Sequence, residues 1–247
     1  MLNIIGRSIK GVAFDLEGTV INLESLHHTA HLLTARIIGV KLPDLTSIDE
    51  ITNLIPHFIG GPRELIAQEI FTLSNKEASV ESIVKLQSQT YHRFLAERND
   101  FEPRKGFLKF LESITELGLK TSIGSLTPKD EAGIILGKSG LNILFNSDSI
   151  VLREDVKNLK PSPDVYLETA RRMGIMPYQQ LVFEDSPRGI QAANTANSLA
   201  FAMPVYDNEY VRRELDMAGA LRIFNDWREI DLNRYTSIEN RRPLPKS

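Results

Sequence analysis

The second half of the chain alternates short apolar runs with amphipathic stretches, and this alternation constrains the fold more than any other feature. Segments of helical character, about ten residues long, separate five apolar runs at Leu119–Ser125, Ser149–Leu152, Leu181–Glu184, Ser198–Met203 and Leu221–Phe224. Strands joined by helices form β-α-β units and a mainly parallel sheet. We therefore expect an α/β fold built around a parallel sheet.

The segment that follows the first apolar run departs from this pattern. After Val12–Asp15, about 80 residues carry helical patterns and almost no strand signal, with apolar residues at spacings of three and four over Arg63–Phe71 and Gln87–Glu97. The 247 residues exceed one typical domain of about 150. We predict that the excess is an all-helical domain at residues 22–100, inserted into an α/β core of residues 1–21 and 101–247.

Three predicted helices begin with a hydroxyl residue followed by proline, at Thr127-Pro128, Ser162-Pro163 and Ser186-Pro187. The hydroxyl suits the N-cap and the proline suits the first helical position. In a parallel sheet such helix N-termini lie near the carboxyl ends of the strands, where anions bind. Ordinary capping without a ligand is the alternative interpretation.

Composition excludes several classes of protein. The chain has 29 basic and 32 acidic residues, which indicates no overall attraction to nucleic acid, and it has no Cys, which excludes disulfides, thiolate catalysis and Cys-based metal sites. No run of 18 uncharged apolar residues occurs, and Met1–Gly11 lacks the apolar stretch of a secretory signal. We expect a cytoplasmic protein that binds neither nucleic acid nor membranes.

Two carboxylates follow the first apolar run, in the sequence Phe14-Asp15-Leu16-Glu17-Gly18. Residues two positions apart on an extended backbone point to the same side. Paired carboxylates at the end of a strand suit either a hard metal ion or a nucleophile with an acid/base partner. An acidic turn without function is the alternative.

Three later clusters carry further polar groups. Glu184 and Asp185 follow another apolar strand, Lys160 is held between prolines in Lys160-Pro161-Ser162-Pro163, and Ser125 ends its own strand. Two acidic strand ends side by side would form an all-oxygen magnesium site. A cation and a hydroxyl near such a site indicate a phosphate pocket.

Together, these four clusters resemble the haloacid dehalogenase superfamily of phosphohydrolases and phosphomutases. The order of acidic motif, helical insert, serine, Lys-Pro and acid pair matches that superfamily over residues 11–224. The position of the insert resembles the branch that contains β-phosphoglucomutase and phosphoglycolate phosphatase. The resemblance implies a Rossmann-like three-layer core with a parallel sheet and an inserted all-helical cap domain.

The resemblance also implies a role for each residue of the clusters. Asp15 matches the nucleophile that forms an aspartyl-phosphate, and Glu17 matches the general acid/base. Ser125 and Lys160 match the groups that hold the phosphoryl oxygens and take part in catalysis.

The same resemblance implies a Mg²⁺ cofactor. Its ligands would be Asp15, the backbone carbonyl of Glu17, and Asp185. Glu184 would be either a further ligand or a group behind the ligands.

Two residues of the helical segment match substrate-binding positions of the branch. His27 lies where β-phosphoglucomutase-like members have a histidine that approaches the active site, and Arg63, in Gly60-Gly61-Pro62-Arg63-Glu64, resembles the arginine that binds a distal phosphate. A histidine at the edge of an amphipathic helix and a solvated arginine are the alternatives.

Several positions depart from the pattern of the superfamily. Most members have Asp where this chain has Glu17, and the longer side chain moves the proton donor by roughly an ångström. Asn22 and Leu23 replace a usual Asp-Ser, and Leu126 replaces a small polar residue. The changes at Asn22, Leu23 and Leu126 indicate altered specificity first and altered activity second.

We therefore predict a Mg²⁺-dependent phosphatase that acts on a small phosphorylated metabolite through an aspartyl-phosphate, as a monomer or homodimer. A phosphosugar mutase is the alternative that His27 and Arg63 favour. A catalytically weak binding or regulatory protein is the alternative that four departures favour, at Glu17, Asn22, Leu23 and Leu126.

Overall fold

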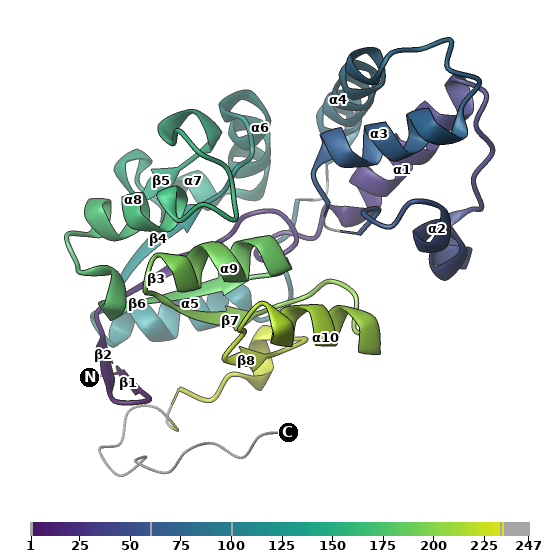
Figure 1. The fold of residues 1–247 in the computed structure, drawn as a ribbon. Helices are drawn as coiled ribbons and strands as arrows, with labels where there is room; N and C mark the ends of the chain where they lie inside the picture. Colours follow the sequence, from purple (N-terminus) through teal and green to yellow (C-terminus); the bar gives the residue numbers. More distant parts are fainter. Residues whose placement is uncertain (1, 60, 100, 233, 235–247) are drawn as a thin grey trace. The chain divides into compact units, whose positions relative to one another are not determined.

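The structure is a computed structural model that describes residues 2–59, 61–99, 101–232 and 234. The chain divides into two compact units, one formed by Met1–Asn22 with Asp100–Ser247 and the other by Leu23–Asn99 (Figure 1). The first is an α/β unit and the second consists of helices. The interpretation of the helical unit as a cap over an active site stays a prediction.

The α/β unit contains a six-stranded sheet in which every neighbouring pair of strands is parallel. Its order is β5 (Ile150–Val151), β4 (Lys120–Gly124), β3 (Gly11–Phe14), β6 (Gln180–Glu184), β7 (Leu199–Ala202) and β8 (Arg222–Ile223). Each strand lies within two residues of an apolar run in the sequence. The prediction of an α/β fold with a parallel sheet is confirmed.

Helices cover both faces of the sheet and complete the three layers (Figure 1). Neighbouring residues of a strand point to opposite sides of a sheet, so residues along β3 and β6 alternate between its two faces. Ala13 and Val182 pack in one apolar cluster with residues of α8 (Asp164–Met173), α9 (Pro187–Thr195) and α10 (Glu209–Met217).

The opposite face of the sheet is aromatic. The Phe14 ring lies 5.3 Å from Phe107 at the start of α5 (Phe107–Glu116), and 5.7 Å each from Phe183 of β6 and from Trp227. These four rings are among the largest fully buried side chains of the protein. Burial of such large side chains is a main source of stability for the sheet that carries the polar clusters.

Two more helices, several 3-10 turns and a hairpin belong to the α/β unit. Helices α6 (Lys129–Ser139) and α7 (Leu141–Leu144) follow β4, and 3-10 turns lie at Ser147–Ser149, Arg153–Asp155, Pro177–Gln179 and Trp227–Glu229. An antiparallel hairpin of β1 (Leu2–Ile4) and β2 (Arg7–Ile9) precedes the sheet. The sequence analysis did not predict this hairpin, since three-residue strands carry almost no periodic signal.

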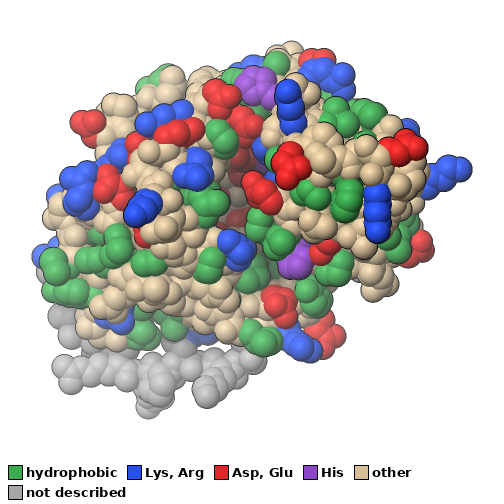
Figure 2. All heavy atoms as spheres, turned by 45° about the horizontal axis from the view of Figure 1, so that its top comes forward, with side chains coloured by type: hydrophobic (Ala, Val, Ile, Leu, Met, Phe, Trp, Pro, Cys, Tyr) green, Lys and Arg blue, Asp and Glu red, His purple; other side chains and the backbone are tan. Residues whose placement is uncertain are grey.

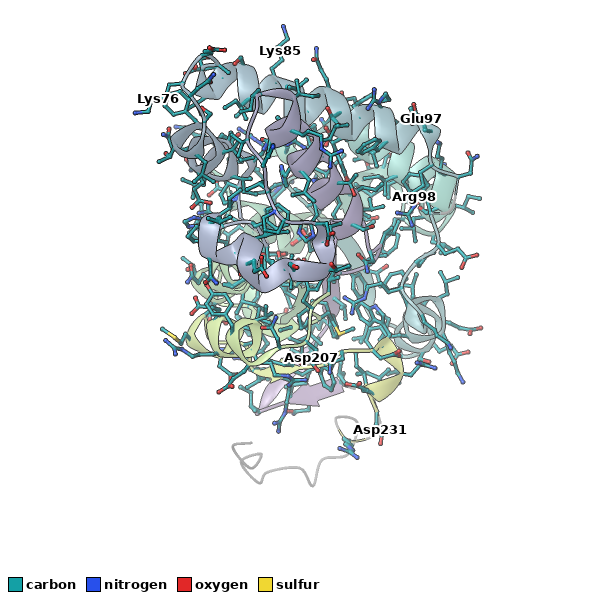
Figure 3. All side chains as sticks on the ribbon, turned by 90° about the vertical axis from the view of Figure 1, so that its right-hand side faces the viewer. Lys76, Lys85, Glu97, Arg98, Asp207 and Asp231 are labelled. Carbon is teal, nitrogen blue, oxygen red and sulfur yellow. The ribbon has the colours of Figure 1, made fainter. Side chains whose placement is uncertain are left out.

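The helical unit consists of α1 (Glu24–Ile37), a 3-10 turn (Leu45–Ser47), α2 (Ile48–Leu54), α3 (Arg63–Leu73) and α4 (Val80–Glu97). Helix α4 packs against both α1 and α3. Its apolar face contributes Ile83 to a core shared with Ile51, Ile66 and Ile70, whereas Lys85 and Glu97 point outward from α4 (Figure 3). Amphipathic packing of this kind explains the helical periodicity of the sequence.

Of the three predicted N-caps, only Ser186 is confirmed. Its hydroxyl accepts a hydrogen bond from Gly189 N at 3.1 Å, with Pro187 in the first turn of α9. The predictions for Thr127 and Ser162 are wrong, because the following prolines occupy the cap positions of α6 and α8. The two hydroxyls bond side chains instead: Thr127 donates to Glu17, and Ser162 donates to Asp164.

Over the residues that the structure describes, no helix combines the length and the apolar character that a membrane span requires. On the face drawn in Figure 2, Lys and Arg side chains lie among Asp and Glu side chains and do not gather into one basic area. This distribution agrees with the near balance of charges in the sequence.

Candidate active site

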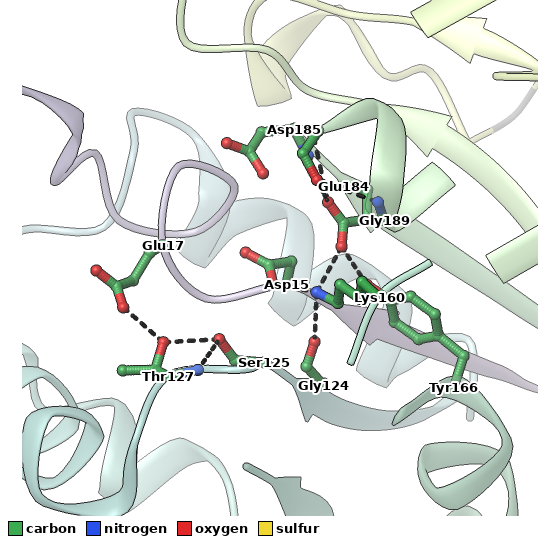
Figure 4. A network of polar contacts seen from close by, with 11 residues as sticks. Asp15, Glu17, Gly124, Ser125, Thr127, Lys160, Tyr166, Glu184, Asp185 and Gly189 are labelled. Carbon is green, nitrogen blue, oxygen red and sulfur yellow. Dashed lines mark hydrogen bonds and ion pairs between the residues drawn. The ribbon is translucent and has the colours of Figure 1, made fainter. Parts of the chain in front are cut away.

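The carboxyl ends of β3, β4 and β6 bring together the predicted site residues of the α/β unit (Figure 4). Asp15 directly follows β3, Ser125 follows β4, and Glu184 is the last residue of β6. The three strands are neighbours in the sheet, so their ends meet at one edge. Lys160 joins them from the loop before α8.

The ammonium group of Lys160 links two of these carboxylates. Its Nζ lies 2.5 Å from Asp15 Oδ1 and 2.6 Å from Glu184 Oε1, and it also donates to the Gly124 carbonyl at 3.3 Å. Lys160 is only 7% exposed. Burial lowers the pKa of Lys160, but the charges of Asp15 and Glu184 more than offset burial and raise that pKa above its usual value. The group therefore stays cationic.

Asp15 lies in an excess of negative charge. Burial raises the pKa of Asp15 to about 7; Lys160 opposes that shift, and the carboxylates of Glu184 and Glu17 add to it. A single ammonium faces several carboxylates at this edge of the sheet. A second, divalent cation would restore the balance and favour the ionised form of Asp15.

Glu184 is saturated with hydrogen bonds. Its Oε1 accepts from Lys160 and from the Tyr166 hydroxyl at 2.6 Å, and its Oε2 accepts from Asp185 N and from the N and Oγ of Ser186 at 3.0–3.2 Å. The Glu184 side chain is fully buried. Such a carboxylate has little capacity left for a metal ion. These contacts favour a role in which Glu184 supports the metal ligands and does not bind the metal ion itself.

The carboxylates at this edge of the sheet form a cluster that fits a hard cation. Oxygens of Asp15, Glu184 and Asp185 lie within 4.8 Å of one another. Gly18 leaves room for the Asp185 carboxylate, because a Cβ on Gly18 would lie 2.0 Å from Asp185 Oδ2. The φ of Gly18, +82°, is also one that favours glycine. Carboxylate and carbonyl oxygens are the ligands that Mg²⁺ prefers. Asp15 and Asp185 are therefore suitable donors, and the Glu17 carbonyl as a third ligand stays a prediction.

The Glu17 side chain takes part in a second network at the same edge. Thr127 Oγ1 donates to Glu17 Oε1 at 2.5 Å, and Ser125 Oγ lies 2.8 Å from the same Thr127 oxygen (Figure 4). The sequence analysis treated Thr127 as a helix cap and did not place it in the site. Its position two residues after Ser125 was the available signal.

Arg104 is a further residue that the sequence analysis did not single out for the site. Its guanidinium donates to four backbone carbonyls, at Gly18 (2.8 Å), Met203, Pro204 (3.0 Å) and Asn225 (2.9 Å). These carbonyls belong to three separate loops, one of which carries Glu17 and Gly18. Arg104 therefore fixes the turn after β3, and no local sequence pattern predicts such long-range contacts.

His27 and Arg63 lie together within the helical unit. The rings of His27 and Tyr91 are stacked with centroids 3.8 Å apart, and the Arg63 guanidinium lies 5.7 Å from the same Tyr91 ring. Arg63 also donates to Ser88 Oγ at 2.7 Å. Gly60, part of the predicted substrate loop, lies outside the described residues. The substrate-binding roles of His27 and Arg63 stay predictions.

The parallel sheet and the buried lysine between carboxylates at its strand ends agree with one family of hydrolases. The family model of haloacid dehalogenase-like hydrolases matches residues 9–197, and the chain belongs to this family. The family predicted from the sequence is thereby confirmed.

Curated relatives include phosphatases. The chain is 29% identical to the fructose-1-phosphate phosphatase YqaB of Escherichia coli, over 75% of this chain and 92% of that protein. It is also 29% identical to a phosphorylated carbohydrates phosphatase of Thermotoga maritima, over 76% of this chain and 82% of that protein. A solved structure, the HAD hydrolase of family IA, variant 3, from Entamoeba histolytica, shares the fold with a TM-score of 0.77 at 21% identity, over 92% of this chain and 97% of that one.

Proposed function

We propose that this hydrolase is a Mg²⁺-dependent phosphatase that cleaves phosphoric monoesters of a small metabolite. The observation that carries the proposal is the position of Lys160 Nζ, 2.5 Å from Asp15 Oδ1 and 2.6 Å from Glu184 Oε1. A cation fixed beside a candidate nucleophile can hold a phosphoryl oxygen and neutralise the charge that builds up during phosphoryl transfer. Membership of a hydrolase family with named phosphatase relatives supports the same reaction.

In the proposed reaction, a carboxylate oxygen of Asp15 attacks phosphorus and forms an aspartyl-phosphate while the bond from phosphorus to the ester oxygen breaks. Glu17 donates a proton to the leaving oxygen, which departs as an alcohol. Glu17 then accepts a proton from the water that attacks phosphorus, and Asp15 is regenerated. Lys160 and Ser125 hold the phosphoryl oxygens throughout both steps.

Mg²⁺, held by Asp15, Asp185 and the Glu17 carbonyl, would supply positive charge to the phosphoryl group. Glu184 would act behind these ligands, where its bonds to Lys160 and Tyr166 orient the ammonium group. The saturated hydrogen bonding of Glu184 supports this division of roles. A carboxylate with both oxygens engaged gains little by taking a metal ion as well.

We further propose that the substrate is a phosphorylated carbohydrate. Two curated relatives, at 29% identity each, bear names that specify fructose 1-phosphate and phosphorylated carbohydrates. The cytoplasmic location and the monomeric or homodimeric state stay predictions from the sequence.

One observation favours a phosphosugar mutase as a second candidate. His27 and Arg63 share one Tyr91 ring, which places a cation and an imidazole close together in the helical unit. A mutase needs such a site for the second phosphate of a bisphosphate. It would show little phosphate release and would require a bisphosphate activator.

Phosphate release from a panel of phosphorylated sugars and phosphoglycolate, with and without Mg²⁺, tests the proposal. The proposal requires Mg²⁺-dependent release by the native protein and loss of that release in Asp15→Asn. Isomerisation of a sugar phosphate without net release would favour the mutase. No turnover of any kind would favour a binding or regulatory protein.

A further inference from the structure

We propose that Thr127 is a positioning residue that holds the carboxylate of Glu17 in place for its proton transfers. The inference rests on the proposed function of Glu17 as the general acid/base. It assigns to Thr127 a role beyond the local capping that its sequence context indicates. Thr127 would act on the reaction through Glu17.

The geometry of Thr127 supports this role. The residue is 6% exposed, and its Oγ1 donates to Glu17 Oε1 at 2.5 Å, across 110 positions of the sequence. A short hydrogen bond to a carboxylate is among the stronger kinds in proteins. The Thr127 hydroxyl does not serve as the N-cap of α6, since Pro128 takes the cap position and the Lys129 N–H at the start of that helix donates to the Glu154 carboxylate instead.

The donors and acceptors of the network allow one arrangement when Glu17 is ionised. A carboxylate only accepts, so the single proton of the Thr127 hydroxyl is directed to Glu17. Thr127 Oγ1 must then accept from Ser125 Oγ, at 2.8 Å. Ser125 Oγ in turn accepts from Thr127 N at 3.3 Å, which ties the network to the backbone.

This arrangement also explains the length of the side chain at position 17. Most members of the superfamily have aspartate there, which is one methylene, or roughly an ångström of reach, shorter. A glutamate has one more freely rotating bond and loses more entropy when it is fixed. The bond to Thr127 supplies the constraint that the longer side chain requires, so the two residues act as a pair.

Kinetics of Thr127→Val test the proposal, because valine keeps the shape of threonine and removes the hydroxyl. We expect kcat to fall at least about tenfold with little change in KM, since misplacement of a proton donor slows the chemical steps. Thr127→Ser keeps a hydroxyl and should restore most of kcat. Thr195→Val is the matched control, because that exposed hydroxyl bonds only the Gln191 carbonyl of its own helix, and it should leave kcat unchanged.

A double-mutant cycle separates positioning from a general structural effect. In Glu17→Asp, whose shorter side chain falls short of Thr127, the further change Thr127→Val should have no effect on kcat. An equal loss of kcat from Thr127→Val in both backgrounds would overturn the proposal, and so would a failure of Thr127→Ser to restore kcat.

A crystal structure of Thr127→Val provides a readout that does not depend on catalysis. The proposal expects the Glu17 carboxylate to leave its position in the native protein or to become disordered. An unmoved, ordered carboxylate overturns it. If the native protein releases no phosphate at all, the proposed function fails, whereas this structural comparison still decides whether Thr127 holds Glu17.

Discussion

The carboxylate of Glu184 lies directly against Gly189 in the first turn of α9. A Cβ on Gly189 would stand 1.8 Å from Glu184 Cδ, a distance that no side chain tolerates. Glu184 fills this space, and its Oε1, which would lie 1.9 Å from that Cβ, accepts the hydrogen bond from Lys160. The absence of a side chain at Gly189 therefore helps to determine where the Lys160 ammonium lies.

Gly189→Ala should consequently damage catalysis and stability together. Displacement of Glu184 by about 1 Å would move Lys160 and reduce kcat on the order of a hundredfold. Overpacking of this kind typically costs about 1–3 kcal/mol of unfolding free energy. Steady-state kinetics and urea unfolding check both effects.

Gly137→Ala is the matched control for that variant. Gly137 also lies in a helix, and a Cβ there meets nothing within 4 Å. The higher helix propensity of alanine should stabilise the protein by up to about 1 kcal/mol and leave kcat unchanged. Equal behaviour of the two alanine variants would refute the close contact of Gly189 with Glu184.

Arg104→Lys should reduce both stability and kcat, although the charge is kept. Lysine lacks the planar fork with which Arg104 reaches carbonyls of three loops, among them Gly18. Loss of several of these partly buried bonds should cost about 2–4 kcal/mol, because the carbonyls are left without donors. Arg228→Lys, at an exposed ion pair with Asp226, should behave like the native protein in the same unfolding and activity assays.

Glu168 on α8 should give the stability of the α/β unit a specific dependence on pH. Hydrogen bonds from Arg171 and Arg172, together with their charges, lower the pKa of Glu168 to about 2, although burial opposes the shift. A lowered pKa means that the contribution is complete above the usual value of 4.5 and disappears as pH falls toward 2.

Urea unfolding of Glu168→Gln between pH 7 and pH 2 tests this dependence. Because Arg171 is largely exposed, solvent screening limits the loss at pH 7 to about 1 kcal/mol. The difference from the native protein should shrink between pH 4.5 and pH 2. Glu116→Gln, on the exposed side of α5, provides the control, and a difference for Glu168→Gln that stays constant with pH would contradict the assignment.

Arg63→Ala tests the predicted second anion site of the helical unit. Arg63 lies near His27 through the shared Tyr91 ring. If Arg63 binds a second anionic group, KM should rise about tenfold or more for bisphosphates and phosphorylated acids, and little for simple monophosphates. An equal rise for all substrates would remove Arg63 from the binding site.

Much of the fold was predictable because its signals are local. The six parallel strands follow from apolar runs, and Ser186-Pro187 marks the start of α9 correctly. Thr127 and Ser162 have the same local pattern, yet the Ser162 hydroxyl donates to Asp164 two residues on, and the Thr127 hydroxyl donates to Glu17, 110 positions away. A hydroxyl residue followed by proline therefore predicts the start of a helix well, but it does not predict the hydrogen-bond partner of the hydroxyl.

The candidate site was predictable for a different reason. Asp15, Ser125, Lys160 and Glu184 each end a strand or precede a helix, and a parallel sheet brings such positions to one edge. The supporting residues depend on tertiary packing instead. Gly189 meets Glu184 only once β6 and α9 are packed, and Arg104 bonds Gly18, 86 positions away, so no periodic pattern indicates either contact.

Chemical trapping of the phosphorylated enzyme tests whether Asp15 is the nucleophile. The native protein, mixed with a substrate from the release assay and Mg²⁺, is quenched within one turnover and analysed by peptide mass spectrometry. We expect phosphate on Asp15 in the native protein and none at this position in Asp15→Asn. Rapid phosphate release with no phosphorylated Asp15 at any quench time, or undiminished release by Asp15→Asn, would contradict it.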